Sequence, residues 1–219
     1  MSLAVEIMRE QIQQTGSMMA AGGLVTGTCG NISARVPGEP YYVVTPSGIP
    51  YDRIKKKDLV VVDGSGHVIN SERRPSTELK MHLSIYNARE EVGAIVHTHS
   101  IYACALAVAG KSLPPILEEM AQLVGGAVPV ARYARAGTFN LAAAAVEALG
   151  ESNAVLLANH GLVGMGRDVA EAYQVCLVVE KAAQVYAWAT TMGRVEIIAQ
   201  DDVQTLRHQF LYEYGQPKE

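Results

Sequence analysis

Short strand-like segments separated by turn-forming residues fill much of the first third of the chain, and they constrain its fold most. Residues 30–36 and 41–45 flank a turn at Pro37-Gly38, and residues 59–63 and 67–70 flank a glycine-rich hairpin turn. Hairpins join neighbouring strands in antiparallel order. Mixed with the helices that follow, they favour an α/β sandwich around a largely antiparallel sheet over a doubly wound parallel sheet.

Helical and strand-like patterns alternate through the rest of the chain. Apolar residues repeat at helical spacing in the N-terminal segment, which ends near Gly22-Gly23, and residues 169–192 carry the longest helical pattern. Further helices are predicted at 75–89, 100–109, 140–149 and 201–212, and further strands at 93–98, 126–130, 154–158 and 161–165. Because no linker or internal repeat divides the chain, we expect one domain over residues 1–219.

The composition excludes several classes of function. Hydrophobic residues make up 49% of the chain and charged residues 18%, which is ordinary for a globular protein. A net charge of −4 argues against a nucleic-acid partner. The chain has no apolar signal core and no run long enough for a membrane span, and its cysteines, Cys29, Cys104 and Cys176, are dispersed and odd in number. We therefore expect a cytoplasmic protein with free thiols and no membrane partner.

The sharpest local signal is the pair of histidines in Val96-His97-Thr98-His99. Side chains alternate along a strand, so His97 and His99 point to the same face, about 7 Å apart. Both imidazoles can then bind one metal ion at roughly 2.0–2.1 Å. The competing interpretation is a pair of core histidines, and two on one face without a nearby polar partner weaken it.

A third histidine, His160, follows another apolar strand and precedes Gly161. Taken alone it is typical of a turn histidine. With His97 and His99 it completes a set of three neutral ligands, which leaves one coordination position of a zinc ion open. That arrangement is typical of catalytic rather than structural zinc.

The segment Pro75-Ser76-Thr77-Glu78 has two interpretations. As a helix start, Ser76 is the N-cap and Glu78 interacts favourably with the helix dipole. As a site, the same helix end binds a phosphate and Glu78 acts beside it as a base. The turns at residues 28–31 and 45–48 also expose backbone N–H groups, but neither matches a nucleotide-binding fingerprint.

Together these motifs resemble the class II aldolase and epimerase family, closest to its members that cleave fuculose 1-phosphate. The resemblance runs in family order from near residue 20 to near residue 190. The matching stretches are Gly27-Thr28-Cys29-Gly30-Asn31-Ile32-Ser33, Thr45-Pro46-Ser47-Gly48-Ile49-Pro50-Tyr51, Pro75-Ser76-Thr77-Glu78, Val96-His97-Thr98-His99 and Asn159-His160-Gly161-Leu162.

The resemblance implies a three-layer α/β sandwich and a homotetramer with active sites between subunits. It implies one Zn²⁺ per subunit, with Mn²⁺ or Co²⁺ as alternatives, held by His97, His99 and His160. Glu78 would complete the empty metal site and, once displaced by substrate, act as the catalytic acid/base. The substrate would be a phosphorylated ketose, cleaved to dihydroxyacetone phosphate and an aldehyde such as L-lactaldehyde. Its phosphate would be bound by Gly30, Asn31, Ser47, Gly48, Ser76 and Thr77.

The resemblance implies two positions that face the aldehyde end of the substrate and a third in the C-terminal tail. The family's fuculose-phosphate enzymes have a catalytic tyrosine that reaches into the neighbouring subunit. At the corresponding position this chain has a carboxylate, which is Glu119, or Glu118 if the alignment gap is placed differently. Ala136 replaces an aromatic residue before Gly137-Thr138. Tyr214 matches a tyrosine of the family's C-terminal tail, and we expect it to be catalytic.

Two rival interpretations remain. A related enzyme, such as a 5-deoxyribulose-phosphate aldolase, a ribulose-phosphate 4-epimerase or a methylthioribulose-phosphate dehydratase, would share the metal and the fold. A non-catalytic scaffold with an aldolase-like fold, as in the head domain of adducin, would need neither ligands nor a base. The three histidines and Glu78 weigh against the scaffold.

Overall fold

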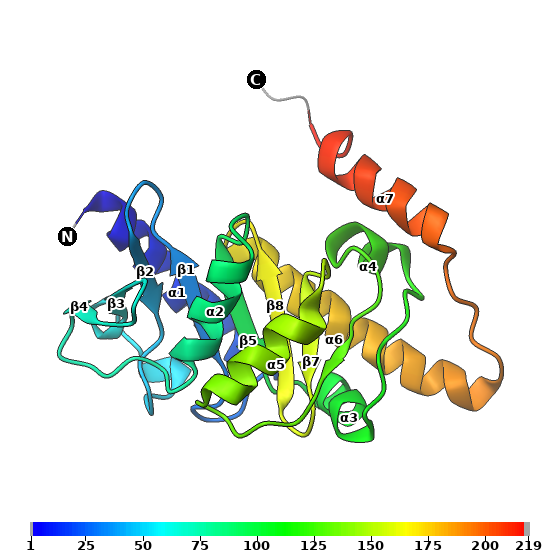
Figure 1. Cartoon of the computed structure of the whole chain (residues 1–219), viewed down its shortest axis with the longest axis horizontal. Helices are drawn as coiled ribbons and strands as arrows, with labels where there is room; N and C mark the ends of the chain where they lie inside the picture. The colour runs from blue at the N-terminus through cyan, green and yellow to red at the C-terminus, as the bar shows by residue number, and fades with distance from the viewer. Residues whose placement is uncertain (1, 217–219) are drawn as a thin grey trace.

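The computed structural model of the protein describes residues 2–216 and has a central eight-stranded sheet with helices on both faces (Figure 1). The strand order is β4-β3-β2-β1-β5-β8-β7-β6, and β6–β7 is the one parallel pair in this sheet. The strands are β1 (Asn31–Arg35), β2 (Tyr41–Val44), β3 (Val60–Asp63), β4 (Val68–Asn70), β5 (Ala94–Thr98), β6 (Val130–Ala131), β7 (Ala154–Leu157) and β8 (Gly161–Gly166). The expected α/β sandwich with a largely antiparallel sheet is confirmed.

Two apolar cores, one on each face of the sheet, make the molecule a three-layer structure. One core packs α1, α3 and α6 against the sheet, and the other packs α2 and α5 against the opposite face. The helices are α1 (Leu3–Ala21), α2 (Leu79–Ala88), α3 (Ile101–Ala109), α4 (Glu118–Leu123), α5 (Phe139–Leu149), α6 (Val169–Met192) and α7 (Gln200–Tyr212), with short 3-10 turns at Tyr51–Arg53 and Lys56–Asp58. None of the helices within residues 2–216 is long and apolar enough to cross a membrane.

Most predicted elements occur where the sequence patterns indicated, and α6 has the predicted bounds. The strand expected at 126–130 shrinks to two residues, Val130–Ala131. Helix α4 (Glu118–Leu123) was not predicted. It is six residues long, too short for its periodicity to stand out from the chain around it.

The start of α2 differs from the expectation that Ser76 is its N-cap. Ser76 N–H donates to Thr45 C=O at 3.0 Å, and Pro75 forms an isolated bridge with Pro46, so this segment is extended. The helix begins at Leu79, with Glu78 as its N-cap residue, and Ser76 Oγ instead accepts from Glu78 N–H at 3.2 Å. Tertiary pairing with the 45–48 turn therefore moves the N-cap two residues further along the chain, from Ser76 to Glu78.

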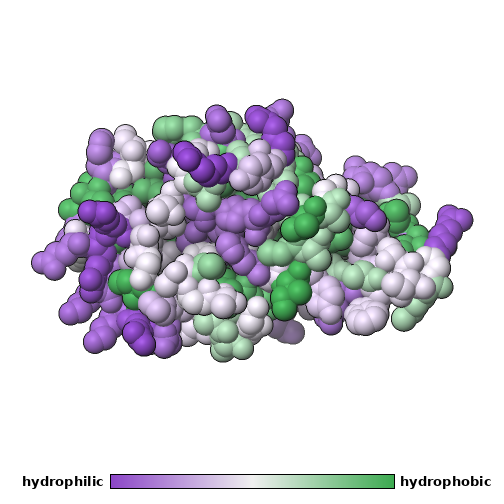
Figure 2. Space-filling view, turned by 90° about the horizontal axis from the view of Figure 1, so that it is seen from below, coloured by the Kyte–Doolittle hydropathy of each residue, from purple (hydrophilic) through white to green (hydrophobic). Residues whose placement is uncertain are grey.

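The strand ends define two opposite ends of the molecule. Strand β5 leads into α3 at the lower end in Figure 1, whereas α4 and α7 lie at the upper right. Figure 2 looks at the lower end, where hydrophilic side chains gather in the middle of the face. The residues described next come from this end.

Candidate metal centre

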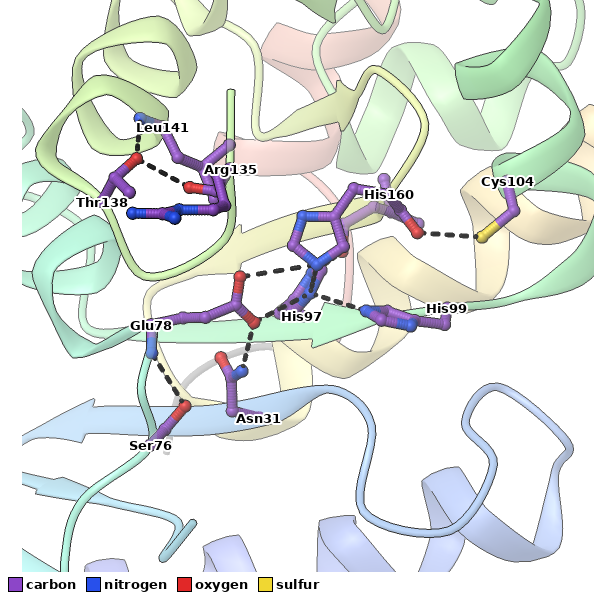
Figure 3. A network of polar contacts seen from close by, with 11 residues as sticks. Asn31, Ser76, Glu78, His97, His99, Cys104, Arg135, Thr138, Leu141 and His160 are labelled. Carbon is purple, nitrogen blue, oxygen red and sulfur yellow. Dashed lines mark hydrogen bonds and ion pairs between the residues drawn. The ribbon is translucent and has the colours of Figure 1, made fainter. Parts of the chain in front are cut away.

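Three histidine side chains converge at the lower end of the sheet (Figure 3). His97 is on β5, His99 follows the end of that strand, and His160 lies in the turn between β7 and β8. The Nε2 atoms of His97 and His99 are 3.0 Å apart, and those of His97 and His160 are 3.3 Å apart. The structure thus brings together the three histidines that the sequence analysis singled out.

The geometry of these three side chains fits a metal ion. Four ligands at roughly 2.0–2.1 Å from a tetrahedral zinc lie about 3.3 Å from one another, close to the separations seen here. His97 Nδ1 is 2.9 Å from the C=O of Leu162, and when the neutral ring carries its proton on Nδ1 to donate this hydrogen bond, the Nε2 lone pair faces the other rings. Converging lone pairs of this kind suit a cation.

A buried carboxylate, Glu78, faces the same point. Glu78 Oε2 lies 3.2 Å from His97 Nε2, and Glu78 Oε1 lies 3.5 Å from His160 Nε2. The side-chain amide of Asn31 donates to Glu78 Oε2 at 2.8 Å. Asn31 is the strand partner of His97, so the β1–β5 pairing itself aligns the amide with the metal centre. The carboxylate can serve as a fourth metal ligand, or as an acid/base next to a bound metal ion.

Charge and burial tune the protonation of these groups. Burial, with the nearby His97, lowers the pKa of both His99 and His160 to about 4, so both are neutral and ready to bind metal at neutral pH. Burial also opposes charge on His97 and on Glu78. Their mutual attraction and hydrogen bond overcome it, raising the pKa of His97 and holding the pKa of Glu78 well below its usual range. Glu78 is therefore ionised.

The turn that presents His160 depends on its neighbours. Asn159 has a positive φ of 56°, a left-handed conformation that asparagine tolerates better than most residues. A Cβ on Gly161 would lie 2.4 Å from the C=O of Thr98 and 3.1 Å from the His97 ring. Only glycine allows β8 to begin this close to β5, which explains the glycine after the histidine.

The residues expected to bind a substrate phosphate lie at the same end of the molecule. Gly30 packs so closely on β5 that a Cβ would come within 2.5 Å of the C=O of His97. The 45–48 turn, with Ser47 and Gly48, is hydrogen-bonded to residues 74–76, where Ser47 N–H donates to Arg74 C=O at 3.0 Å. Thr77 is exposed beside buried Ser76 and Glu78. Three segments far apart in the sequence thus lie side by side near Glu78.

Two other expected catalytic residues lie elsewhere in this chain. Glu119 is on α4, at the opposite end of the sheet in Figure 1, and forms an ion pair with Lys181 at 2.7 Å. Tyr214 follows α7, is 78% exposed, and stacks on Phe210 with ring centroids 5.6 Å apart. The fold of one chain does not bring them to the histidines.

One charged residue near the centre was missed by the sequence analysis. Figure 3 shows Arg135 on the loop that passes beside Glu78, and Gly137 of this loop packs against the C=O of Thr77. Arg135 is exposed, so it adds a positive charge to the surface near the metal centre. The loop lies far from the histidines in sequence, and its composition gave no signal of this placement.

Comparison with known proteins gives the chain a family. The fold is that of the class II aldolases: an L-fuculose 1-phosphate aldolase of known structure matches with a TM-score of 0.90 at 34% identity, covering 94% of this chain and 96% of that one. Residues 10–187 match the family model described as class II aldolase and adducin N-terminal domain. The chain belongs to this family, and its membership supports a metal-dependent, aldolase-type lyase that acts on phosphorylated sugars.

Two curated relatives match nearly the whole chain. A 5-deoxy-D-ribulose 1-phosphate aldolase from Bacillus thuringiensis serovar kurstaki is 39% identical over 208 residues, covering 95% of this chain and 97% of the relative. An L-fuculose phosphate aldolase from Haemophilus influenzae is 34% identical, covering 94% of each. The resemblance drawn from the sequence motifs is thereby confirmed.

Proposed function

We propose that the protein is a zinc-dependent aldolase that cleaves a ketose 1-phosphate to dihydroxyacetone phosphate and an aldehyde. The observation that carries the proposal is the buried Glu78 carboxylate within 3.5 Å of two of three converging histidine nitrogens. His97, His99 and His160 would hold the metal ion. When bound, it would act as a Lewis acid toward the ketose carbonyl.

In this mechanism Glu78 moves the proton at C3 of the sugar. Breaking the C3–C4 bond would leave the electron pair on C3, and the proton of the C4 hydroxyl would pass, directly or through water, to the ionised Glu78 carboxylate as C4 becomes the aldehyde carbonyl. Glu78 would then deliver a proton to C3 to give dihydroxyacetone phosphate, and remove it again in the reverse direction. Asn31, which donates to Oε2, would hold the carboxylate in line for this transfer.

The substrate phosphate would be bound by Gly30, Asn31, Ser47, Gly48, Ser76 and Thr77. Support comes from the convergence of the 28–31, 45–48 and 74–77 segments beside Glu78. Exposed backbone N–H groups and hydroxyls of this kind stabilise an anion without a net basic surface. Arg135 near the metal centre would add attraction for a dianionic substrate.

Two ketose phosphates are the leading substrates. Fuculose 1-phosphate would release L-lactaldehyde, and 5-deoxyribulose 1-phosphate, with one carbon fewer in its tail, would release acetaldehyde. The 39% identity to a 5-deoxy-D-ribulose 1-phosphate aldolase supports 5-deoxyribulose 1-phosphate as the alternative substrate, to be tested together with fuculose 1-phosphate. Glu119 in place of the expected tyrosine, and Ala136 in place of an aromatic residue, also point away from a strict fuculose enzyme.

We further infer a homotetramer whose sites lie between subunits. Helices α6 and α7 and the segment joining them expose large apolar side chains, including Trp188 at 57%, Met192 at 83% and Ile197 at 58%. Such apolar surface marks sites of association. A second subunit would also explain how Glu119 and Tyr214, remote from the histidines in their own chain, could take part in catalysis.

The proposal is tested by release of dihydroxyacetone phosphate from each sugar, with and without prior chelation. Chelator-sensitive release, restored by Zn²⁺, is expected from at least one of them. A zinc-loaded protein that releases none from either sugar would contradict the aldolase assignment. Epimerase and dehydratase assays on phosphorylated pentuloses would then identify the activity.

A further inference from the structure

Behind the metal centre, a ladder of polar contacts joins α2 to β1 inside the second core. Its first rung is the bond from Asn31 to Glu78. The second is Ser33 Oγ, which lies 2.6 Å from Nδ1 of His82 and 2.9 Å from the hydroxyl of Tyr86. Ser33, His82 and Tyr86 are each no more than 1% exposed, so the rung is sealed from solvent. None of these three residues has a role in the mechanism proposed above.

The repeat lengths of the two elements explain why the ladder stays in register. Two residues of a strand advance about 6.7 Å and four residues of a helix about 6 Å, so strand positions 31, 33 and 35 keep step with helix positions 78, 82 and 86. Arg35 completes the series by donating to Tyr86 C=O, and also donates to Val92 C=O at 2.9 Å, just before β5. A shift of α2 by one turn would break every rung.

The second rung works through hydrogen-bond geometry and not through charge. Burial lowers the pKa of His82 to about 3, so its imidazole is neutral at neutral pH. An apolar pair of similar size would fill the same space, but it would not impose a distance and a direction on α2. A buried polar contact does so, because any misalignment leaves both partners without a bond.

We propose that Ser33 and His82 are positioning residues that set where the Glu78 carboxylate lies relative to His97 and His160. The inference rests on the proposed function, in which Glu78 is the acid/base. His82 lies one helical turn after Glu78, and Ser33 lies two residues after Asn31 on the same face of β1. The rung therefore fixes both the helix end that carries the carboxylate and the strand that carries its donor.

A double-mutant cycle tests the proposal, using Ser33→Ala, Glu78→Gln and the double variant, with kcat and KM measured by dihydroxyacetone phosphate release. Ser33→Ala alone should lower kcat about 10–100-fold, as loss of a supporting contact to a metal or catalytic group does, with KM little changed. In the Glu78→Gln background the same change should lower the residual kcat less than twofold. Zinc content and the near-ultraviolet circular dichroism should match those of the wild type.

Control variants separate positioning from general loosening of the core. Cys176→Ala removes a buried contact from Cys176 Sγ to Val96 C=O on the opposite face of β5, and it should leave kcat unchanged. His82→Gln provides a second variant with the same expected coupling if Ser33→Ala does not fold. An equal loss of kcat in both Glu78 backgrounds, or no loss in Ser33→Ala, would overturn the positioning role. Wild-type turnover in Glu78→Gln would instead overturn the proposed acid/base.

Discussion

At the scale of single residues, the proposed chemistry of the site depends on Glu78. Its carboxylate contacts two histidines and one amide in a buried setting, and its pKa is held low by the charge and hydrogen bond of His97. A carboxylate in this state is an acceptor that becomes an acid only when substrate changes its surroundings. In the proposed mechanism Glu78 is a metal ligand in the resting site and transfers a proton in the occupied one.

Replacing Glu78 with Gln tests that role. The amide keeps the size of the side chain but carries no transferable proton at neutral pH, so we expect kcat to fall about 10²–10⁴-fold. Zinc should remain bound through the three histidines. Steady-state kinetics together with elemental analysis check both parts, and unchanged turnover would contradict the assignment.

The sequence was sufficient for part of this site. Strand alternation predicted that His97 and His99 share a face, and the strand-end position of His160 predicted a third ligand. The bond from Asn31 to Glu78 and the contact from Ser33 to His82 depend instead on how α2 lies along β1, across 47 and 49 residues of chain. No local pattern encodes that register, so these contacts became visible only in the folded chain.

At the scale of elements, the closeness of β8 to β5 holds His160 beside His97. Gly161→Ala would place a Cβ 2.4 Å from Thr98 C=O, forcing the strands apart. We expect reduced thermal stability and faster loss of zinc to a chelator. Gly64→Ala is the matched control, because its Cβ would meet nothing within 4 Å, and it should behave as the wild type. Equal behaviour of the two variants would refute this account of the turn.

The buried His82 gives a pH dependence of stability with a defined sign. Its pKa is about 3 in the folded protein against an ordinary value of 6.5, so between these values the unfolded chain binds more protons. Stability is therefore lost as pH falls through this window, at up to about 1.4 kcal/mol per pH unit from this residue. We expect the free energy of unfolding of the metal-free protein, measured with urea at a series of pH values, to depend less steeply on pH in His82→Gln than in the wild type. Equal slopes would show that His82 is not held neutral.

The sequence predicted the boundaries of an element well where its apolar pattern extended over many residues. It predicted them poorly where tertiary contacts determine where the element begins or ends. The long apolar face of α6 gave its bounds directly. Helix α2 begins later than its capping signal indicated because Ser76 is hydrogen-bonded to Thr45. Strand β6 is short because only Val130–Ala131 pairs with β7, and the signal of α4 was too short to detect.

At the scale of the whole molecule, the two ends of the sheet have different roles in the proposed mechanism. One end carries Glu78 and the histidines, and the other carries α4 with Glu119 (Figure 1). If neighbouring subunits place the two ends together, each site draws residues from two chains. A closed oligomer meets this requirement through repetition of one interface.

Subunit complementation tests the shared site. Glu78→Gln and Glu119→Gln proteins should each have low activity alone. In randomly mixed oligomers about a quarter of the sites would combine a native Glu78 with a native Glu119, so activity should rise toward a quarter of the wild-type value. Co-expression of the two variants with different tags supplies the mixed oligomers. Activity no greater than the average of the two parents would place each site within one chain.

The claim on which the account depends is that His97, His99 and His160 hold a metal ion, and zinc content per subunit tests it most directly. Elemental analysis after reconstitution and extensive dialysis should find about one zinc per subunit in the wild type and in His67→Ala, whose side chain is exposed on the β3–β4 hairpin. It should find almost none in His97→Ala. Full zinc occupancy in His97→Ala, or none in the reconstituted wild type, would contradict the proposed centre.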